Sequence, residues 1–294
     1  MSTGTGDKPS RTGTGDKPSR TGTGDKPHRI GAIVLAGSRG PSDPVAAAAG
    51  VSHKALVPVA GIPMLARVLD TLAAVPAVGP VVVLIEQPAL VQDHPAFAAA
   101  LARGTLRILP AAGSPSRSVL AALDTLDPAL PCLVTTADHP LLTPTMVEHF
   151  LAQLPAGTDA VAGLARAETI RGAFPHSRRT YLRFRDGAFS GCNLFALRGP
   201  AARAVVTFWR RVEQDRKQPW RMVRLLGPGT LLAFALGRLR LDTALRRLGR
   251  LTGTTLGVVE MPFAEAAVDV DRPDDLRLAE AILAGRQARE VPAA

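Results

Sequence analysis

From residue 30 onward, short uninterrupted apolar runs alternate with stretches that have helical periodicity, and few architectures accommodate this pattern. A run of four to eight apolar residues is typical of a strand buried on both faces of a sheet. Strands that alternate with helices pair in parallel, and the right-handed crossovers place helices on both faces. The sequence therefore predicts an α/β fold with a mostly parallel sheet.

The pattern is clearest in the first half of the chain. The apolar runs predict strands at Ile30–Leu35, Val81–Ile85, Leu106–Leu109 and Cys132–Thr135. Apolar residues at helical spacing predict helices at Met64–Ala74, Ala96–Ala102, Ser118–Leu126 and Thr143–Leu154. Thr143 followed by Pro144 is a typical helix start, with the threonine as N-cap.

The second half is less regular. Strands are predicted at Asp159–Leu164, Thr180–Arg185, Asn193–Leu197 and Thr255–Met261, and helices at Pro200–Asp215 and Asp274–Ala284. We find no linker long enough to separate two domains, so we expect one domain over residues 29–294 with a helical insertion at about 200–250. Residues 219–241 interleave apolar side chains with arginines, which fits either a helical lid packed on the core or an amphipathic segment that touches an anionic membrane; we favour the lid.

The segment before the first strand is a tandem repeat. TGTGDKPSR occurs twice and TGTGDKPHR once, and these repeats contain no apolar residue that could be buried. Such a composition cannot offset the entropy of ordering the chain. We expect residues 1–28 to be a disordered tail.

Composition excludes several classes of protein. The 294 residues are 46% hydrophobic and 20% charged, so the chain as a whole is not disordered. No apolar run reaches the length of roughly 20 residues that spans a bilayer. The two cysteines, Cys132 and Cys192, are too few to stabilise a fold of this size through disulfides, and they form no zinc motif. We therefore expect a reducing cytoplasm as the compartment.

The charge balance points to anionic partners. The net charge of +10 favours nucleic acid, a membrane surface or a phosphorylated metabolite, although part of it is also consistent with an ordinary arginine-rich surface. Only 4% of the residues are aromatic and no nucleic-acid-binding motif occurs, which argues against nucleic acid. The oligomeric state is not predicted.

Parallel sheets bind ligands beyond the carboxyl ends of their strands, so the loops after Leu35, Leu109 and Thr136 are the expected site. The first of these loops, Leu35-Ala36-Gly37-Ser38-Arg39-Gly40, is rich in glycine, which lets backbone N–H groups approach phosphate oxygens. Arg39 and Lys54 would add positive charge for a triphosphate. An ordinary turn with two surface cations is the alternative.

Acidic residues supply the second half of the expected site. Asp138 follows a buried strand, where a carboxylate suits Mg²⁺ or caps the next helix. Asp269 and Asp271 alternate along a predicted strand and should share one face, which calls for a cation or an arginine. Asp274 and Asp275 fall in the first turn of the last helix, where they favour a capping role.

Four segments together carry a family resemblance. They are Ile33–Gly37, Lys54–Leu65, Thr135–Pro140 and Asp269–Leu276. In order and approximate spacing they resemble the MobA-like group of nucleotidyltransferases. The resemblance is good over about 30–165 and 255–285 and loose between them. It implies a Rossmann-like, GT-A-type fold and transfer of a nucleoside monophosphate from a nucleoside triphosphate to a phosphorylated acceptor, with release of pyrophosphate.

The resemblance also implies roles for individual residues. The backbone of Leu35–Arg39 and the side chain of Lys54 would bind the triphosphate. Asp138 and Asp271 would hold Mg²⁺, with Asp269 as a third ligand. Ser118 matches the serine near the base and ribose in related cytidylyltransferases, and a helix N-cap is its alternative role. The glycine loop is one small residue shorter than the family pattern, which puts the role of Arg39 in doubt.

The acceptor and the base are less determined. Candidates for binding the acceptor phosphate are Arg166, Arg171, Arg178 and Arg179, and Ser190–Asn193 could place an amide near its hydroxyls. CTP is slightly favoured over GTP, and the acceptor is expected to be a sugar or polyol phosphate. The competing functions are a GT-A glycosyltransferase that uses a nucleotide sugar and a non-catalytic nucleotide-binding module.

Overall fold

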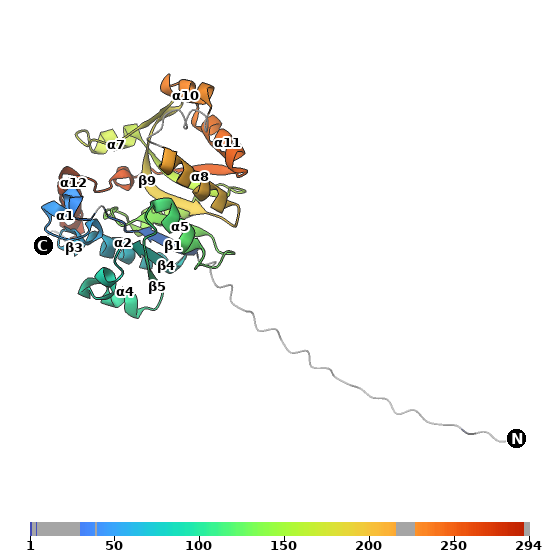
Figure 1. Cartoon of the computed structure of the whole chain (residues 1–294), viewed down its shortest axis with the longest axis horizontal. Coiled ribbons are helices and arrows are strands. Elements are labelled where there is room, and N and C mark those ends of the chain that lie inside the picture. Colours follow the sequence, from blue (N-terminus) through green and yellow to red (C-terminus); the bar gives the residue numbers. More distant parts are fainter. Residues whose placement is uncertain (2–3, 5–29, 39, 216–226, 291–294) are drawn as a thin grey trace.

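The structure is a computed structural model that describes residues 1, 4, 30–38, 40–215 and 227–290. The expected tail, apart from residues 1 and 4, and Arg39 lie outside the described residues. One large sheet runs through the centre of the molecule, with helices on both of its faces (Figure 1).

The described part of the sheet has eight strands in the order β10-β7-β9-β6-β1-β4-β5, with β8 paired to β9. The bounds are β1 Ile30–Leu35, β4 Val78–Ile85, β5 Leu106–Pro110, β6 Cys132–Thr136, β7 Ala160–Arg166, β8 Leu182–Phe184, β9 Gly187–Leu197 and β10 Leu256–Glu260. A separate hairpin joins β2 Pro58–Val59 to β3 Ile62–Pro63. In the large sheet β9 runs opposite to both β6 and β7, whereas the pairs β1–β4, β1–β6, β4–β5 and β7–β10 are parallel.

The helices form two layers over the sheet. Their bounds are α1 Pro44–Ala48, α2 Met64–Ala73, α3 Ala89–Gln92, α4 Ala98–Ala102, α5 Pro115–Leu123, α6 Pro144–Ala152, α7 Ala167–Ala173, α8 Ala202–Asp215, α10 Pro228–Ala235, α11 Leu241–Thr252 and α12 Pro273–Glu290. Helices α2 and α6 pack on one face of the sheet, and α5 and α8 on the other. The mostly parallel α/β fold predicted from the sequence is confirmed.

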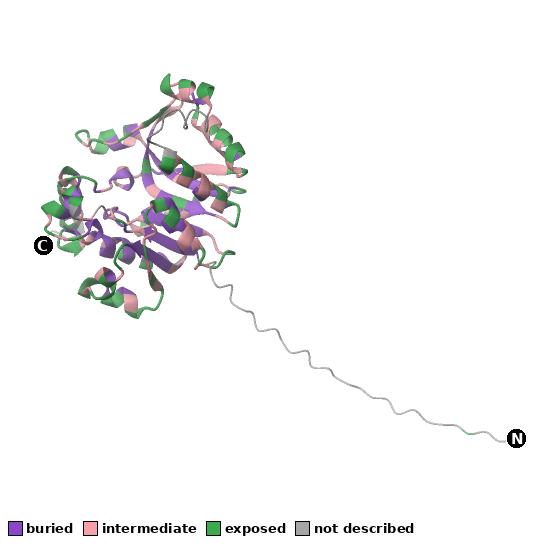
Figure 2. Ribbon diagram, viewed as in Figure 1, coloured by how far each residue is buried: buried purple, intermediate pink, exposed green. Residues whose placement is uncertain are grey.

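Alternating side chains along the strands fill both layers. In β1, Ile33 joins the core under α5 and α8, while its neighbours Ala32 and Val34 join the core under α2 and α6. These strand residues are buried (Figure 2). Burial on both faces explains why the strands read as continuous apolar runs.

Most predicted elements are present with shifted ends. The threonine N-cap is confirmed, because Thr143 Oγ1 accepts a hydrogen bond from the Met146 N–H at 3.3 Å. One expectation is wrong: residues 268–271 are not a strand but an extended link between a 3-10 turn at Ala264–Ala267 and α12. Asp269 and Asp271 therefore face different partners, as described below.

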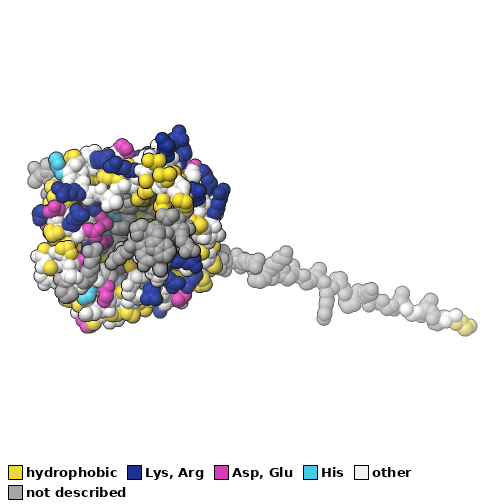
Figure 3. All heavy atoms as spheres, turned by 45° about the horizontal axis from the view of Figure 1, so that its top comes forward, with side chains coloured by type: hydrophobic (Ala, Val, Ile, Leu, Met, Phe, Trp, Pro, Cys, Tyr) yellow, Lys and Arg dark blue, Asp and Glu magenta, His cyan; other side chains and the backbone are white. Residues whose placement is uncertain are grey.

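The part of the chain expected to be a helical insertion contains α8, α10 and α11. Residues 219–226 of the expected lid or membrane segment lie outside the described residues. Helix α10 packs Phe234 edge-on against Phe184 but leaves Leu232 and Leu236 exposed. On the face seen in Figure 3, hydrophobic side chains gather between groups of Lys and Arg side chains. Across the described residues, no helix is both long and apolar enough to cross a membrane.

Candidate active site

The order of the strands places the candidate site. From β1 the chain moves to β4 and β5 on one side, and then to β6 on the other side of β1. Open α/β sheets bind ligands at the carboxyl ends of the strands where the order reverses in this way. The loop after Leu35 and the turn after Thr136 meet at this point, because β1 and β6 are parallel neighbours in register.

Hydrogen bonds to the backbone fix how the glycine loop leaves β1. The Ala36 N–H donates to the Leu84 carbonyl at 2.9 Å, so the loop departs from the sheet after residue 36. The Ser38 N–H then donates to both carboxylate oxygens of Glu86, at 3.0 and 3.2 Å. A Cβ at Gly37 would lie 3.2 Å from Glu86 Oε1, so a larger residue there would require the exposed Glu86 side chain to shift. The Glu86 carboxylate thus binds the Ser38 N–H, a backbone donor that is expected to bind phosphate.

Lys54 connects the glycine loop with the acidic residues. Its N–H donates to Ser38 Oγ at 3.3 Å, and its side chain is 10% exposed. Its ammonium group lies 2.6 Å from Asp138 Oδ2 and 2.7 Å from Asp271 Oδ1. The structure therefore brings together Lys54, Asp138 and Asp271, three residues predicted from the sequence to act together.

The electrostatic balance keeps Lys54 charged. Burial lowers its pKa, but the charge of Asp138 and hydrogen bonds to Asp138 and Asp271 outweigh this effect, so the net shift is upward. A permanently protonated lysine between two carboxylates is a point charge that could exchange a carboxylate for a phosphate oxygen.

A backbone hydrogen bond fixes the two carboxylates relative to each other. The Val270 N–H donates to the carbonyl of Asp138 at 2.9 Å, which ties the link before α12 to the end of β6. Asp275 Oδ2 then accepts from the N–H groups of Asp271 and Arg272, at 3.2 and 3.0 Å. The predicted capping role of Asp275 is confirmed, and it orients Asp271.

Asp269 belongs to a second group of charges beside the first. Its carboxylate and its carbonyl accept from the Arg179 guanidinium, which also reaches Asp275 Oδ1 at 2.9 Å. Burial and the nearby charges of Asp271 and Asp138 raise the pKa of Asp269, and Arg179 opposes that shift. In this structure Asp269 pairs with an arginine, which was one of the two outcomes foreseen for it.

An irregularity in β9 supplies another polar contact to Asp269. The register between β7 and β9 shifts between Ala162 and Leu164, and Asn193 opposite has a φ of 50°. Asparagine tolerates this left-handed conformation, and bulges next to sites re-aim side chains. Asn193 Nδ2 donates to Asp269 Oδ2 at 3.3 Å.

Ser118 lies in the first turn of α5 and contacts the loop after β5. Its Oγ accepts from the Ala112 N–H at 2.9 Å and so orders the loop after β5. The N-cap alternative is wrong, because α5 begins at Pro115 and Ser114 Oγ caps it by accepting from the Arg117 N–H. Ser118 therefore holds a loop at the carboxyl edge of the sheet.

The residues at the end of β6 fit a divalent cation in part. Asp138 Oδ1 is buried without a hydrogen-bond partner among the described residues, and so are Oγ1 of Thr135 and Thr136. A carboxylate with an unsatisfied oxygen atom beside a phosphate loop suits Mg²⁺, which takes one or two carboxylates and completes its shell with phosphate and water. The described residues contain no ready group of three His, Cys, Asp or Glu ligands.

One contributor to this site, Glu86, was not found from the sequence, and Arg179 and Asn193 were expected at the acceptor and not at Asp269. Glu86 follows the second strand of the parallel set, and its position at a carboxyl end was the only available signal. The salt bridges of Arg179 and the amide of Asn193 depend on contacts to Asp269 some 90 and 76 positions away. Sequence spacing carries no information about such pairs.

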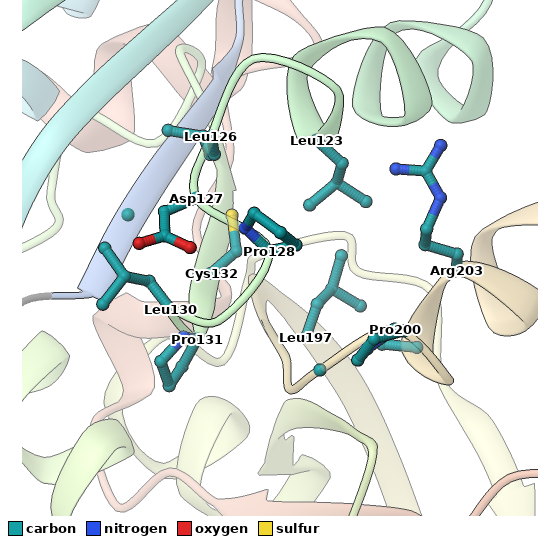
Figure 4. A pocket seen from close by; sticks show the side chains of 13 residues that line it. Leu123, Leu126, Asp127, Pro128, Leu130, Pro131, Cys132, Leu197, Pro200 and Arg203 are labelled. Carbon is teal, nitrogen blue, oxygen red and sulfur yellow. The ribbon is translucent and has the colours of Figure 1, made fainter.

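A small pocket at the opposite edge of the sheet is not a competing site. It is lined by apolar residues near the start of β6, among them Leu126, Pro131 and Cys132, with Asp127 and Arg203 at its rim (Figure 4). Its volume of about 70 Å³ is well below the 300–1,000 Å³ of typical ligand sites.

A lysine between two carboxylates, next to a glycine loop at the reversal point of a parallel sheet, is a site suited to a nucleoside triphosphate. The family comparison agrees: residues 32–250 match the model of the MobA-like NTP transferase domain. The chain belongs to this family. The matched range includes Lys54 and Asp138 and ends before Asp269 and Asp271.

Solved structures share the fold. A hypothetical transferase from Thermus thermophilus is 34% identical, with a TM-score of 0.71, over 84% of this chain and 99% of that one. The 4-diphosphocytidyl-2C-methyl-D-erythritol synthase of Anaerococcus prevotii is 13% identical, with a TM-score of 0.55, over 87% and 96%. A CMP:2-keto-3-deoxy-manno-octonic acid synthetase, in complex with CTP, is 17% identical, with a TM-score of 0.50, over 88% and 98%. No curated protein matches the chain.

Proposed function

We propose that this nucleotidyltransferase is Mg²⁺-dependent and transfers a nucleoside monophosphate, with CTP favoured over GTP, to a phosphorylated small molecule such as a sugar or polyol phosphate. Pyrophosphate is the second product. The observation that carries the proposal is the position of Lys54, 2.6 Å from Asp138 and 2.7 Å from Asp271, beside the backbone donors of the glycine loop.

The proposed roles follow from this geometry. The loop predicted to bind the triphosphate, Leu35–Arg39, and the ammonium of Lys54 form the phosphate site; the Ala36 N–H is already bonded to the Leu84 carbonyl, so the phosphate donors are those after residue 36. Asp138 and Asp271 hold the Mg²⁺, which neutralises phosphate charge when bound. Asp269 remains a candidate third ligand only if Arg179 releases it, because the arginine binds its carboxylate in this structure. Ser118 orders the loop next to the nucleotide.

The reaction requires alignment more than covalent chemistry. An oxygen of the acceptor phosphate forms a bond to the α-phosphorus, and the bond from that phosphorus to the bridging oxygen of the β-phosphate breaks. The electron pair of the broken bond leaves with pyrophosphate. The acceptor phosphate is already ionised at neutral pH, so no residue has to remove a proton. Lys54 and the loop N–H groups stabilise the charge that develops on the leaving group.

Two features support the preference for CTP. Two proteins of the same fold are named for cytidine nucleotides, the 4-diphosphocytidyl-2C-methyl-D-erythritol synthase and the CMP:2-keto-3-deoxy-manno-octonic acid synthetase. In this chain Ser118 holds the loop after β5 by its hydroxyl, at the place where the sequence resembles cytidylyltransferases.

The two competing functions make different predictions. A GT-A glycosyltransferase would need a second carboxylate close to Asp138 in the chain, whereas here the second one comes from Asp271, in a distant segment. A non-catalytic module would bind nucleotide without forming pyrophosphate.

The test measures pyrophosphate release from CTP, GTP, UTP and ATP with a panel of sugar and polyol phosphates, with Mg²⁺ and with a chelator. We expect turnover with CTP that stops in the chelator and falls by about 100-fold or more in Asp138→Asn, because charge stabilisation in such sites is worth this much. Asp159→Asn, which changes a carboxylate remote from Lys54, is the matched control. Undiminished turnover in Asp138→Asn would refute the metal assignment.

A further inference from the structure

The four arginines that were predicted to bind the acceptor phosphate lie in different environments in the structure. Arg166 is bound to Glu260, with Nε 2.6 Å from Oε1. Arg171 lies over the ring of Tyr181, 4.7 Å from its centroid. Arg179 is almost fully buried and pairs with two aspartates. Arg178, by contrast, is exposed and lines an open cavity.

That cavity has two walls from distant parts of the chain. One wall is the segment after α7, with His176 and Arg178, and the other is the start of α12, with Arg272. Its volume is about 610 Å³, within the 300–1,000 Å³ of typical small-molecule sites.

The charges that line this cavity leave it positive. Two aspartates also line it, but each has a cation of its own: Asp274 pairs with Arg277, and Asp275 pairs with Arg179. Arg178 and Arg272 have no such carboxylate partner among the described salt bridges. Two guanidinium groups on facing walls are therefore available to an anion, and guanidinium binds phosphate through paired N–H donors.

Both walls continue directly into the candidate active site. Arg272 follows Asp271, whose carboxylate binds Lys54. Arg178 precedes Arg179, whose guanidinium binds Asp269. Asp275 lines the cavity and accepts a hydrogen bond from the N–H of Asp271, so the cavity lies beside the link that carries Asp271.

We propose that this cavity binds the acceptor, with Arg178 and Arg272 holding the attacking phosphate of a small phosphomonoester. That the bound anion is the acceptor rests on the proposed function, whereas the existence of the anion site does not. Arg178 and Arg272 neutralise the phosphate that approaches the α-phosphorus and leave one of its oxygens free to attack. The volume of the cavity leaves room for a sugar or polyol attached to that phosphate.

The experiment uses the full chain and compares wild type with Arg178→Gln and Arg272→Gln. Calorimetry with inorganic phosphate and with glycerol 3-phosphate measures anion binding, and thermal shift with CTP and Mg²⁺ measures nucleotide binding. Arg247→Gln is the matched control, since it removes an exposed positive charge from α11 and does not line the cavity. We expect each cavity variant to weaken binding of both phosphates about tenfold, as loss of a charge-assisted hydrogen bond implies, with an unchanged shift by CTP.

Four outcomes are distinguishable. Weaker phosphate binding with an intact CTP shift supports the inference, and so does a raised KM for the acceptor with unchanged KM for the nucleotide. Equal phosphate binding in all variants overturns it and leaves the proposed function standing. Arginine-dependent phosphate binding in a protein that shows neither a CTP shift nor pyrophosphate release supports the anion site and overturns the proposed function. Equal losses in Arg247→Gln attribute the effect to general charge and overturn the inference.

Discussion

At the scale of single residues, Lys54 binds two carboxylates in this structure, whereas the proposed function gives it a triphosphate. It neutralises Asp138 and Asp271, and its side chain is 10% exposed. A buried cation is costly to separate from its partners. A nucleotide with its cation must therefore redistribute these charges rather than fill an empty site.

Removal of the charge on Lys54 should show how much it contributes to stability, through Asp138 and Asp271, and to activity. We expect Lys54→Met to lower the melting temperature and to reduce pyrophosphate release about 100-fold, because two carboxylates lose their counter-charge and the triphosphate loses a cation. Asp138→Asn in the same chain should recover part of the stability but none of the activity, since residues in one charge network are not additive. Equal stability of Lys54→Met and wild type would show that the ion pairs are energetically neutral.

Glu86 should compete with the triphosphate. Its carboxylate accepts the Ser38 N–H at 3.0 and 3.2 Å and places a negative charge where phosphate is expected. We expect Glu86→Gln to lower the KM for nucleotide roughly three- to tenfold, equivalent to about 1 kcal/mol for one exchanged hydrogen bond. The KM for the acceptor should not change.

Glu260→Gln is the control, because this carboxylate pairs with Arg166 away from the glycine loop. A higher nucleotide KM in Glu86→Gln would instead mean that Glu86 helps to bind the substrate.

The sequence predicted Lys54, Asp138 and Asp271 as site residues, but it did not predict the contacts between them. Lys54, Asp138 and Asp271 stand in motifs whose type and order are recognisable. Their mutual contacts cross 84 and 217 positions and arise from the sheet order and from one backbone hydrogen bond. Glu86 has no local motif, because any acidic residue after a buried strand reads as an ordinary turn residue.

At the scale of helices and strands, the two wrong strand predictions have one physical origin. The Val-Asp-Val-Asp pattern at residues 268–271 alternates as a strand does, but the Val270 N–H is taken by the Asp138 carbonyl and no neighbouring strand pairs with it. Strand β9 was predicted at Asn193–Leu197 and in fact begins at Gly187, since the bulge around Asn193 interrupts the alternation. Tertiary hydrogen bonds decided both cases, not local propensity.

Helix α10 tests the two interpretations of residues 219–241. Leu232 is 61% exposed and Leu236 57%, and Arg238 and Arg240 follow in the chain. If this face touches an anionic membrane, the protein should sediment with phosphatidylserine vesicles and not with phosphatidylcholine vesicles, and Leu232→Asp with Leu236→Asp should abolish the binding.

Leu251→Asp is the matched control for that experiment, because it replaces an equally apolar side chain that is 49% exposed at the end of α11. Absence of binding to either vesicle would leave α10 as a lid and would remove the membrane interpretation.

At the scale of the whole molecule, the two thiols report on the integrity of the core. Cys132 in β6 is 3% exposed and Cys192 in β9 is 1% exposed, and neither forms a disulfide. Burial raises the pKa of each thiol to about 12, so the reactive thiolate is scarce at neutral pH. We expect no reaction with a thiol reagent in the native protein and two equivalents in denaturant.

The rate of that thiol reaction then measures opening of the sheet. Mg²⁺ with CTP should slow it further, because a ligand that binds only the native state raises the free energy of unfolding by mass action. Rapid labelling of one thiol in the native protein would show that its strand is not packed as described.

The overall architecture was the most predictable level. Buried parallel strands leave a signature of uninterrupted apolar runs, and crossovers leave helical periodicity between them, so sheet type and layers follow from pattern alone. The reversed direction of β9 did not follow, because a strand of either direction has the same pattern of side chains. The positions of α1 and α7 were also missed, since neither exceeds seven residues.

The hydrogen bond from Val270 to Asp138 has a consequence for biosynthesis. During synthesis the glycine loop, Lys54 and Asp138 are all translated before Asp271, which lies 133 positions after Asp138 (271 − 138). The pair of carboxylates around Lys54 is therefore complete only once the link before α12 has docked on the end of β6.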